Sequence, residues 1–478
     1  LAPDWSRLHS AAVESALSSL EQALASSEVP LVRVRGYAPD AFAALQRILP
    51  FSAIYAHEET GLRHTYARDE AVRRWTREQS IGFREFPTNG VIRGLRNRDE
   101  RMSIWKARMA ETPLPIPRIP AASPGVRDLV RKAPQHPAVL NAPPSVRYKG
   151  LRAVAIVQPG SGDDPRAGFA PEAAPGCIVS PTDGERCQAV SLEAAEETLE
   201  SFFKGRGLGY SGGISSMNSA PQAGSRLSVH LAWGTLSLRQ VLHRLNDADA
   251  EWKGLGSDEA RQWRRSLRAF RSRLMWHDHF IQRLEDDPDL ETEPINRAFR
   301  DLAFDGTPDA LEAWISGTTG WPLVDASIRC FHHTGFLNFR SRAMIVSAGV
   351  HALHLDWRDI LYPMARMMAD YIPGIHVSQL QMQAGVTGIN TLRTYSPMKQ
   401  LRDHDPECQF VRRWVPELAD CDPAEIHAAD ELPIAGYRRP LVDHRRATGE
   451  FRSRIYAVRR SAEGRNESAK VLAQHGSR

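Results

Sequence analysis

The sequence predicts two architectures in one chain, an α/β domain with a parallel sheet followed by a large all-α domain. Helix-like and strand-like patterns alternate from residue 11 to about residue 106, which is typical of βα units. From Ser191 onward the apolar pattern is helical, and no convincing strand interrupts it. Nine prolines between Pro113 and Pro144 lie between the two regions, and this density favours an extended linker. We therefore expect an α/β domain over residues 1–112, a linker over 113–190 and a helical domain over 191–478.

The α/β region contains three helix patterns that alternate with three strand patterns. Ala, Leu and Glu dominate the first helix, and β-branched residues mark the first strand. Such units build a parallel sheet, which binds ligands outside the carboxyl ends of its strands. Because the chain opens directly into a helix, we expect the first strand of such a domain to be missing from this sequence. The predicted helices are 10–27, 40–49 and 66–79, and the predicted strands are 31–34, 52–56 and 82–86.

The second region is predicted to be helical throughout. An irregular stretch at 158–182, rich in Gly, Pro and Asp, precedes it and is expected to be a mobile surface loop. The chain shows no internal repeat and no low-complexity tract. The predicted helices are 192–204, 236–245, 258–284, 308–316, 323–333, 340–354 and 359–370.

The composition is that of an ordinary globular protein. Of 478 residues, 42% are hydrophobic and 25% are charged, which excludes wholesale disorder and a collagen-like fibre. No stretch approaches 18 uninterrupted apolar residues, and the N-terminus lacks the pattern of a signal peptide. We therefore expect a cytoplasmic protein that does not enter a membrane.

Cysteine and charge counts narrow the possible partners. The five cysteines are scattered and form no CxxC pair, so we expect neither a disulfide framework nor a metal or iron–sulfur site. Of the 61 basic residues, only seven are lysine. Arginine is suited to binding phosphate, so a phosphate-rich partner would explain this excess, and so would codon bias in a GC-rich genome.

Residues 317–329, Gly-Thr-Thr-Gly-Trp-Pro-Leu-Val-Asp-Ala-Ser-Ile-Arg, resemble the most recognisable stretch of the photolyase and cryptochrome superfamily. Other motifs of that family occur in its order, and together they cover nearly the whole chain. The resemblance implies an N-terminal Rossmann-like domain and a C-terminal helical domain that holds a non-covalent FAD. The other motifs are residues 224–228, 232–237, 274–276, 338–344, 355–358, 393–397 and 410–418.

The first group of expected cofactor residues precedes a predicted helix near Val229. Hydroxyls and backbone N–H groups at a helix N-terminus can receive phosphate oxygens, so this run is a candidate pyrophosphate site. An ordinary N-cap beside an exposed arginine is the alternative. Tyr210 resembles the family tyrosine that also contacts the phosphates, although alone it would more often be a core tyrosine. The run consists of Ser225, Arg226, Leu227 and Ser228.

A second group lies on the helix predicted at 340–354. Arg340 and Arg342 are followed by small and apolar residues, and a buried guanidinium needs a negative partner. The resemblance places Arg342 against the flavin ring and pairs it with an aspartate, for which Asp370 is the candidate. A surface pair of arginines is the alternative. Asn338 lies beside Phe339, which occupies the family's flavin-facing position.

The expected DNA pocket departs from the family pattern. The resemblance makes Trp276 one aromatic wall for a flipped-out pyrimidine dimer, but the opposite wall falls in 379–383, which holds no aromatic residue. Arg273 replaces a glutamate that would hydrogen-bond the dimer. The histidine pair of six-four photolyases falls on Phe339 and Ala343. His376 is a candidate substitute acid, because histidine titrates near neutrality; a structural histidine is the alternative.

The family's electron-transfer chain of tryptophans is also incomplete. Trp357 matches its middle member, whereas the inner position falls in the glutamine-rich stretch and the outer one on Phe304. A different route, through Trp321, Trp314 or Tyr395, would then be needed.

These features support three functional hypotheses. The first is an FAD-dependent photolyase, expected as a monomer, that repairs UV-damaged DNA and binds it with arginines such as Arg393 and Arg412. The second is a cryptochrome-type blue-light photoreceptor without repair activity. The third is a flavoprotein with thermal redox chemistry. An antenna pigment of unidentified kind could lie at the strand ends of the α/β domain. Residues 379–391 are most similar to a divergent bacterial group of the superfamily.

Overall fold

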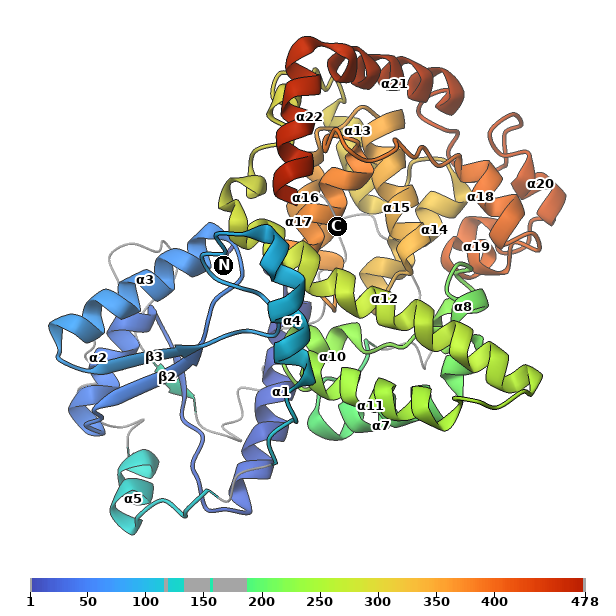
Figure 1. Ribbon diagram of the computed structural model, residues 1–478. Coiled ribbons are helices and arrows are strands. Elements are labelled where there is room, and N and C mark those ends of the chain that lie inside the picture. Colours follow the sequence, from blue (N-terminus) through green and yellow to red (C-terminus); the bar gives the residue numbers. More distant parts are fainter. Residues whose placement is uncertain (1, 116–118, 133–154, 158–186, 476–478) are drawn as a thin grey trace.

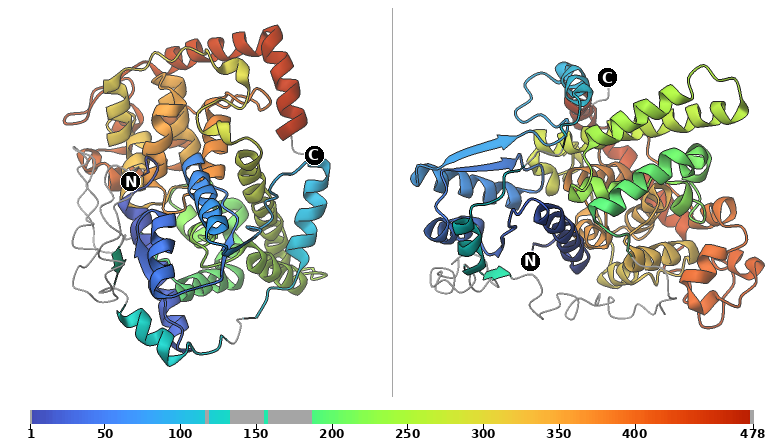
Figure 2. Two further views of the ribbon diagram at one scale, coloured as in Figure 1. Left: turned by 90° about the vertical axis from the view of Figure 1, so that its left-hand side faces the viewer. Right: turned by 90° about the horizontal axis from the view of Figure 1, so that it is seen from below.

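The computed structural model describes residues 2–115, 119–132, 155–157 and 187–475 (Figure 1). A small α/β part at the N-terminal end of the chain lies beside a larger helical part, as the views in Figures 1 and 2 show. The long helix α12 (Asp258–Asp286) runs through the helical part. The predicted fold class is therefore confirmed.

The α/β part is built on two parallel strands, β2 (Ala53–His57) and β3 (Gly82–Phe86). They pair in register from Ala53 opposite Gly82 to His57 opposite Phe86, and helix α3 (Arg63–Glu78) connects them. The rings of Phe42, Phe51 and Trp75 pack together beside this sheet. Helix α2 (Ala38–Ile48) carries the first of these rings.

The first predicted strand does not join this sheet. Strand β1 (Arg33–Arg35) pairs antiparallel with β4 (Ala155–Val157), in a separate two-stranded sheet. The prediction of one parallel sheet over three strands is therefore wrong for β1. Its partner comes from the segment that was expected to be a linker, and a short strand's sequence does not specify which edge it will meet.

The proline-rich segment also contains a helix that the sequence did not predict. Helix α5 (Pro124–Lys132) begins at a proline, where the missing N–H costs nothing because the first turn leaves it unpaired anyway. The expected surface loop at 158–182 lies outside the described residues. High proline density thus excluded helix interiors but not a helix that starts at a proline.

Two helices from the first 112 residues pack on the helical part. Helix α1 (Arg7–Ala25) buries Ala12 against Val229 and Ala369, and His9 Nε2 lies 2.9 Å from the carbonyl oxygen of Met368. Helix α4 (Arg101–Ala110), which follows the turn η1 (Arg98–Glu100), buries Trp105 in an aromatic cluster with helices α7 and α12. These helices connect the two parts of the chain.

Most predicted helices of the second region are present, and capping residues mark their starts. Ser191 caps α7, Ser257 caps α12, and Ser237 with Gln240 forms a capping box at α11, as hydroxyls before an apolar run predict. Between residues 187 and 475 the structure contains no strand. The helices before the core are α7 (Leu192–Lys204), α8 (Tyr210–Gly213), α9 (Ala220–Ala223), α10 (Ser228–Trp233) and α11 (Leu238–Glu251), with the 3₁₀ turn η3 (Arg206–Gly209).

The core of the helical part surrounds helix α14 (Pro322–Thr334), whose first ten residues are all buried. The predicted helix at 340–354 is α15 followed by a π-helical turn. None of the described helices meets the length and apolarity needed to cross a membrane. The remaining elements are η4 (Pro288–Glu291), η5 (Arg297–Phe299), α13 (Pro308–Ser316), α15 (Phe339–Ser347), the π turn η6 (Ala348–Ala352), α16 (Trp357–Met367), α17 (Pro373–Ala384), α18 (Pro397–His404), α19 (Gln409–Trp414), η7 (Pro416–Leu418), α20 (Pro423–His427), α21 (His444–Arg460) and α22 (Ala462–His475).

Candidate functional site

The motif at 317–329 forms the tightly bonded start of α14. The carboxylate of Asp325 is fully buried and accepts hydrogen bonds from the backbone N–H groups of Thr319 and Gly320, at 2.7 and 3.0 Å. It also accepts from the Thr319 hydroxyl at 2.6 Å and the Tyr437 hydroxyl at 2.5 Å. Burial raises the pKa of Asp325. The most recognisable motif of the chain therefore contributes a structural carboxylate.

The same motif is fastened to distant backbone on two further sides. Gly320 has φ +88°, and a Cβ there would lie 2.4 Å from the carbonyl carbon of Arg439, so only glycine fits. Arg329 donates from Nε to the carbonyl of Gly317 at 2.9 Å and binds both carboxylate oxygens of Glu417, at 2.7 and 2.9 Å. Such a bidentate pair fixes the relative orientation of the two side chains. The start of α14 is therefore held in a single position.

Arg342 and Asp370 form the ion pair that the sequence predicts. Nη2 of Arg342 lies 2.9 and 3.1 Å from the two carboxylate oxygens, and Nε donates to the carbonyl of Leu337 at 2.7 Å. The guanidinium also lies over the ring of Phe331 on α14, 5.1 Å from its centroid. The pair is partly buried, so the low dielectric strengthens it.

A glycine at the end of α14 places Asp370 close to this arginine. Gly335 has φ +67°, and its carbonyl accepts from the N–H of Ala369 at 2.9 Å. A Cβ at Gly335 would lie 2.7 Å from the Cβ of Ala369. The helix end and the segment before α17 therefore approach more closely than any side chain would permit.

Arg226 reaches the same place from the loop before α10. Its guanidinium stacks on the ring of Phe336, 3.7 Å from the centroid. Burial lowers the pKa of Arg226 to about 10, and the charge of Asp370 opposes this shift. Because Arg342 already binds both oxygens of that carboxylate, Arg226 remains a half-buried cation that an additional anion would stabilise.

The backbone of this loop is held by two side chains that the sequence analysis missed. Arg206 donates to the carbonyls of Gly224 at 2.6 Å and Ser225 at 3.3 Å. Gln188 donates to the carbonyl of Arg226 at 2.9 Å. Neither residue belongs to a motif, and both reach the loop across long-range contacts, so no local signal marks them.

The rest of the predicted pyrophosphate run is present at the start of α10. The Ser225 hydroxyl accepts from the N–H of Leu227 at 3.4 Å, and the Leu227 side chain is buried. Ser228 begins the helix and is exposed. The run therefore offers backbone N–H groups and hydroxyls beside the Arg226 guanidinium, as a phosphate site requires.

Tyr210 lies in an aromatic core rather than beside this loop's phosphate-facing groups. Its ring makes edge contacts with Phe202 and Phe270. Burial raises the pKa of Tyr210 to about 12, and Arg273 opposes this shift through a hydrogen bond and its charge. The hydroxyl is therefore already engaged by Arg273, and the predicted phosphate contact of Tyr210 has no support from this geometry.

Asn338 and Arg340 also differ from the sequence-based expectation. The Asn338 amide donates to the carbonyls of Ile214 and Ser215 at 3.2 and 3.0 Å, while its oxygen caps α15 at the N–H of Ser341. All its polar atoms thus serve the fold. Arg340 points away from Arg342 toward α18, where the Gln400 side chain accepts at 3.5 Å. The structure shows no carboxylate bound to Arg340 among the described residues.

His376 is a structural histidine. Its ring is buried, and Nε2 donates to the carbonyl of Leu361 at 2.7 Å. Burial lowers its pKa to about 4, with that hydrogen bond opposing. A neutral ring with its proton committed to the backbone is a poor acid near neutrality, so the prediction of His376 as a substitute catalytic acid is wrong.

Trp276 presents the expected aromatic surface on α12. It is half-buried, stacks on Phe280 at 5.5 Å between centroids and meets His279 edge-on at 5.0 Å. Arg273, one turn earlier, is exposed. Trp357 is buried at the start of α16 beneath the guanidinium of Arg358.

The glutamine-rich stretch lies on α17, which packs along α12. Gln381 is a structural clamp: its oxygen accepts from the N–H of Ile295 at 2.6 Å, and its amide donates to the carbonyls of Leu290 and Glu293. Gln379 has a buried side-chain oxygen with no hydrogen-bond partner. This residue is the glutamine best placed to bind a polar group.

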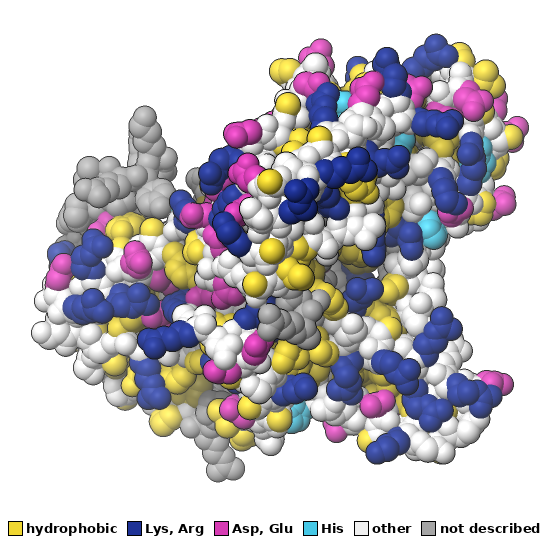
Figure 3. All heavy atoms as spheres, turned by 45° about the horizontal axis from the view of Figure 1, so that its top comes forward, with side chains coloured by type: hydrophobic (Ala, Val, Ile, Leu, Met, Phe, Trp, Pro, Cys, Tyr) yellow, Lys and Arg dark blue, Asp and Glu magenta, His cyan; other side chains and the backbone are white. Residues whose placement is uncertain are grey.

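The predicted DNA-binding arginines are exposed but not grouped. Arg393 follows α17, and Arg412 on α19 donates from Nε to the carbonyl of Ala419. Figure 3 shows a wide spread of arginine and lysine over the face that includes α21. There Arg452, Tyr456 and Arg460 line a shallow pocket. The face is therefore basic over a wide area.

FAD fits the residues gathered at the end of α14. Its diphosphate would supply the anion that the half-buried guanidinium of Arg226 lacks, and its polar ring atoms would meet an unpartnered group on a neighbouring helix. The Ser341 hydroxyl, fully buried between Arg340 and Arg342, has no hydrogen-bond partner among the described residues. Buried polar groups are rarely left unpaired in folded proteins.

Comparisons with known proteins agree with this fit. Residues 270–457 match the FAD binding domain of DNA photolyase. A deoxyribodipyrimidine photo-lyase of Streptomyces griseus is 32% identical over 269 residues, 54% of each chain, so the chain spans about half the length of the curated relatives it matches.

Two solved structures share the fold over nearly the whole chain. A class III photolyase from Agrobacterium tumefaciens superposes with a TM-score of 0.70 at 20% identity, covering 95% of this chain and 89% of its own. A Synechocystis cryptochrome gives 0.69 at 18% identity, covering 94% and 88%. Fold and matched domain together define a flavoprotein with a photolyase-type FAD-binding domain. The chain is thus similar to photolyases over residues 270–457 and shares the fold of photolyases and cryptochromes over nearly its whole length.

Substitution of Arg226 by glutamine is expected to weaken FAD binding about 10- to 100-fold, because a charge-assisted hydrogen bond contributes about 1.5–3 kcal/mol. Fluorescence titration of the apoprotein with FAD measures this. Arg300→Gln, which removes an exposed arginine paired with Glu293, is the matched control and should bind FAD as the wild type does. Equal affinities of the Arg226 and Arg300 variants would show that Arg226 does not contact the cofactor.

Proposed function

We propose that this protein repairs UV-damaged DNA in a light-driven reaction, as a lyase of the photolyase kind. The observation that carries the proposal is the convergence of Arg226, Arg342 and Asp370 at the end of α14, within a chain whose relatives include photolyases. Bound FAD would supply the light absorption and the electron that splits a flipped-out pyrimidine dimer. The protein's own residues would bind and orient the cofactor and the damaged base, and would shield them from water.

Each residue of the site has a role in this proposal. Arg226, with the Ser225–Ser228 backbone, binds the phosphates of the cofactor, and Arg206 keeps that backbone in place. Arg342, paired with Asp370, stabilises negative charge that develops near it. Trp276 offers a ring on which a flipped-out base stacks, which offsets the unstacking of the damaged site.

The departures from the family pattern bear on which photoproduct is bound. Arg273 stands where a glutamate would hydrogen-bond a cyclobutane dimer, and its exposed guanidinium favours a phosphate or carbonyl oxygen instead. The buried oxygen of Gln379 on α17 is an acceptor for a base N–H. These groups would replace the usual pocket residues, for either a cyclobutane dimer or a six-four photoproduct.

Damaged DNA should bind more tightly than undamaged DNA of the same sequence, and Trp276→Ala should remove about 10- to 100-fold of that preference, because base stacking contributes about 1–3 kcal/mol. Fluorescence anisotropy at fixed salt measures both affinities. Trp276→Phe keeps an aromatic face and should retain most of the preference. If wild-type protein binds damaged and undamaged duplexes equally, the repair proposal fails.

A cryptochrome-type photoreceptor without repair activity is the second candidate. The absence of an aromatic side chain over residues 379–383 of α17 favours it, because a flipped-out dimer then lacks its second stacking surface. Such a protein would still bind FAD and respond to blue light, but it would not distinguish damaged from undamaged DNA. The anisotropy experiment therefore separates the two candidates.

An antenna pigment stays a prediction for the α/β part, where the strand ends of β2 and β3 would hold it. The arginines Arg393 and Arg412 are proposed as phosphate contacts of the DNA partner, so affinity should fall steeply with salt.

A further inference from the structure

Four basic side chains are buried together where η1, α4, α12 and α22 meet, away from the residues proposed to hold FAD. His279 and Arg283 lie one turn apart on α12, Arg101 begins α4, and His475 ends α22. Each is at most 6% exposed. Burying several basic groups in one place is costly unless negative charge or hydrogen bonds compensate them.

The hydrogen bonds within the described residues do not compensate this cluster. Arg283 donates from Nη2 to the carbonyl of His475 at 3.1 Å, but its Nε and Nη1 have no hydrogen-bond partner. Nε2 of His279 and Nδ1 of His475 also lack partners. Arg101 shows one weak contact, to the sulfur of Met102 at 3.5 Å.

Two carboxylates face the cluster, and both are already engaged. Asp278 accepts from the N–H of Gly90 and from Trp105 Nε1, both at 2.8 Å. Asp286 accepts from the amide of Gln282 at 2.7 Å. Burial raises the pKa of Asp286 to about 6, so part of its charge is lost near neutrality. Among the described residues, neither carboxylate forms an ion pair with Arg101 or Arg283.

The titration behaviour of the cluster agrees with this lack of ion pairs. Burial and the charge of Arg283 lower the pKa of His279 to about 2, and burial and the same arginine lower that of His475 to about 3. Burial, with Arg98 and Arg101, lowers the pKa of Arg283 itself to about 10. Both histidines are therefore neutral near pH 7, and the positive charge of the junction lies on its arginines.

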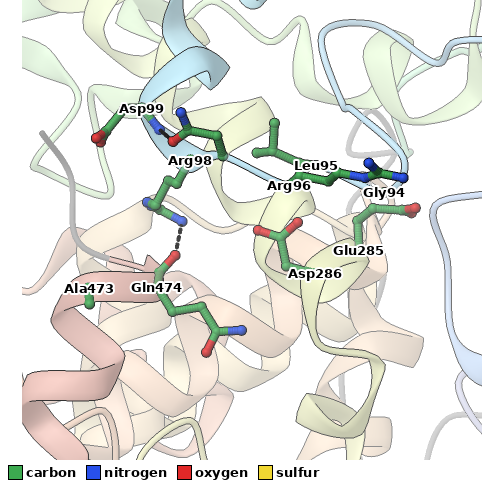
Figure 4. A pocket seen from close by; sticks show the side chains of 10 residues that line it. Gly94, Leu95, Arg96, Arg98, Asp99, Glu285, Asp286, Ala473 and Gln474 are labelled. Atoms are coloured by element: carbon green, nitrogen blue, oxygen red, sulfur yellow. Dashed lines mark hydrogen bonds between the residues drawn. The ribbon is translucent and has the colours of Figure 1, made fainter.

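A hollow of about 530 Å³ adjoins the cluster (Figure 4). Arg98 from η1, Asp286 from α12 and Gln474 from α22 lie around it, and Arg98 donates to the carbonyl of Gln474. Gln474 directly precedes His475 in α22, so the hollow lies next to the buried cluster, and Asp99 and Glu285 also line it.

We propose that this junction binds a small oxyanion of the phosphate class, with the unpartnered nitrogens of Arg283, His279 and His475 as its donors. A planar guanidinium with two unpaired N–H groups matches the geometry of such an anion. A free anion is favoured over a phosphate of the DNA backbone, because side chains this deeply buried are out of reach of a stiff duplex. The proposal does not depend on FAD or on repair.

The test compares thermal unfolding of the full-length wild type with that of Arg283→Met. At constant ionic strength, replacing chloride by 10 mM inorganic phosphate should raise the wild-type Tm by about 2–4 °C. Arg283→Met should lose this response. In phosphate-free buffer the variant should also melt no lower than the wild type, because it removes an uncompensated buried charge while methionine fills the space.

Arg268→Met is the matched control, because Arg268 lies on the same helix and is exposed. It should retain the wild-type response to phosphate. A wild-type Tm that does not respond to phosphate would overturn the proposal. The proposal would also be overturned if Arg283→Met reduced the slope of log affinity for duplex DNA against log salt concentration by about one. That result would assign the site to a DNA phosphate instead.

Discussion

Replacement of Asp325 by alanine is expected to lower the free energy of unfolding by about 3–5 kcal/mol, the largest effect of any single substitution considered for this protein. The side chain accepts four hydrogen bonds in a fully buried position. Alanine would leave those donors without a partner, and each buried unsatisfied group costs about 1–3 kcal/mol. Urea unfolding followed by circular dichroism measures the change.

Asp309→Ala is the control for this prediction. Asp309 also lies in the first turn of a helix that begins with a proline, but it is exposed. Its loss should cost less than about 1 kcal/mol, the contribution of a negative charge near a helix N-terminus. If the two variants unfold at similar urea concentrations, the network around Asp325 does not hold the start of α14.

Acidification from pH 7 to pH 5 is expected to destabilise the protein, and three buried histidines outside the junction of η1, α4, α12 and α22 together account for about 4–6 kcal/mol of the loss. Burial lowers the pKa of His230, His351 and His376 to about 4 in each case. The unfolded chain titrates near 6.5 and therefore binds more protons than the native state between those values. Stability is complete above pH 6.5 and is lost as the pH falls toward 4.

Each of these histidine rings makes its hydrogen bonds in the neutral form. His351 lies 3.2 Å from the carbonyl of Ala384 through Nε2 and 3.0 Å from the Ser347 hydroxyl through Nδ1. Because a carbonyl only accepts, Nε2–H is the donor and Nδ1 accepts from the hydroxyl. Protonation would turn that acceptor into a second donor and place a positive charge on a fully buried ring, which is costly.

Urea unfolding at pH 7 and pH 5 tests this account. In His351→Gln, the difference in stability between the two pH values should shrink by about 2 kcal/mol, because one of the three groups no longer titrates. His57, an exposed histidine, supplies the control: His57→Gln should keep the wild-type difference. An unchanged pH dependence in His351→Gln would contradict the assignment.

The sequence predicted the family from a motif whose role it did not predict. Residues 317–329 carry the resemblance, yet Asp325 and Arg329 serve the fold through contacts with Tyr437 and Glu417 more than 80 residues away. Such partners are brought close only by tertiary folding. In this chain the motif's side chains thus form a buried hydrogen-bonded network that holds the start of α14.

Pairs of opposite charge were easier to predict than solitary polar residues. A buried arginine needs an anion, so the sequence suggested Asp370 for Arg342, and the structure contains that pair. His376 and Asn338 offered no such constraint, because either can satisfy its hydrogen bonds with backbone carbonyls, and both do so. The expected role of Asn338 followed from the family resemblance, and that of His376 from the titration of histidine near neutrality.

The local sequence pattern did not predict how β1 pairs, because its partner strand comes from a distant segment of the chain. The three residues of β1 are compatible with a parallel or an antiparallel neighbour, and β4 decides which one forms. Helix α5 shows the same limit in the proline-rich segment, since a proline at its first position leaves the helix intact. The starts of the helices with a hydroxyl cap were predicted within a few residues, whereas α11 extends to Glu251, beyond the predicted end at residue 245.

The central claim is light-driven repair, and the most direct test is photorepair by the purified protein after loading with FAD and chemical reduction. Oligonucleotides carrying a cyclobutane dimer or a six-four photoproduct are illuminated with blue light, with dark samples as the reference. We expect intact pyrimidines to be restored from one of the two lesions, only in the light. Restoration of neither lesion, while the bound FAD still responds to light, would contradict the account and identify a photoreceptor.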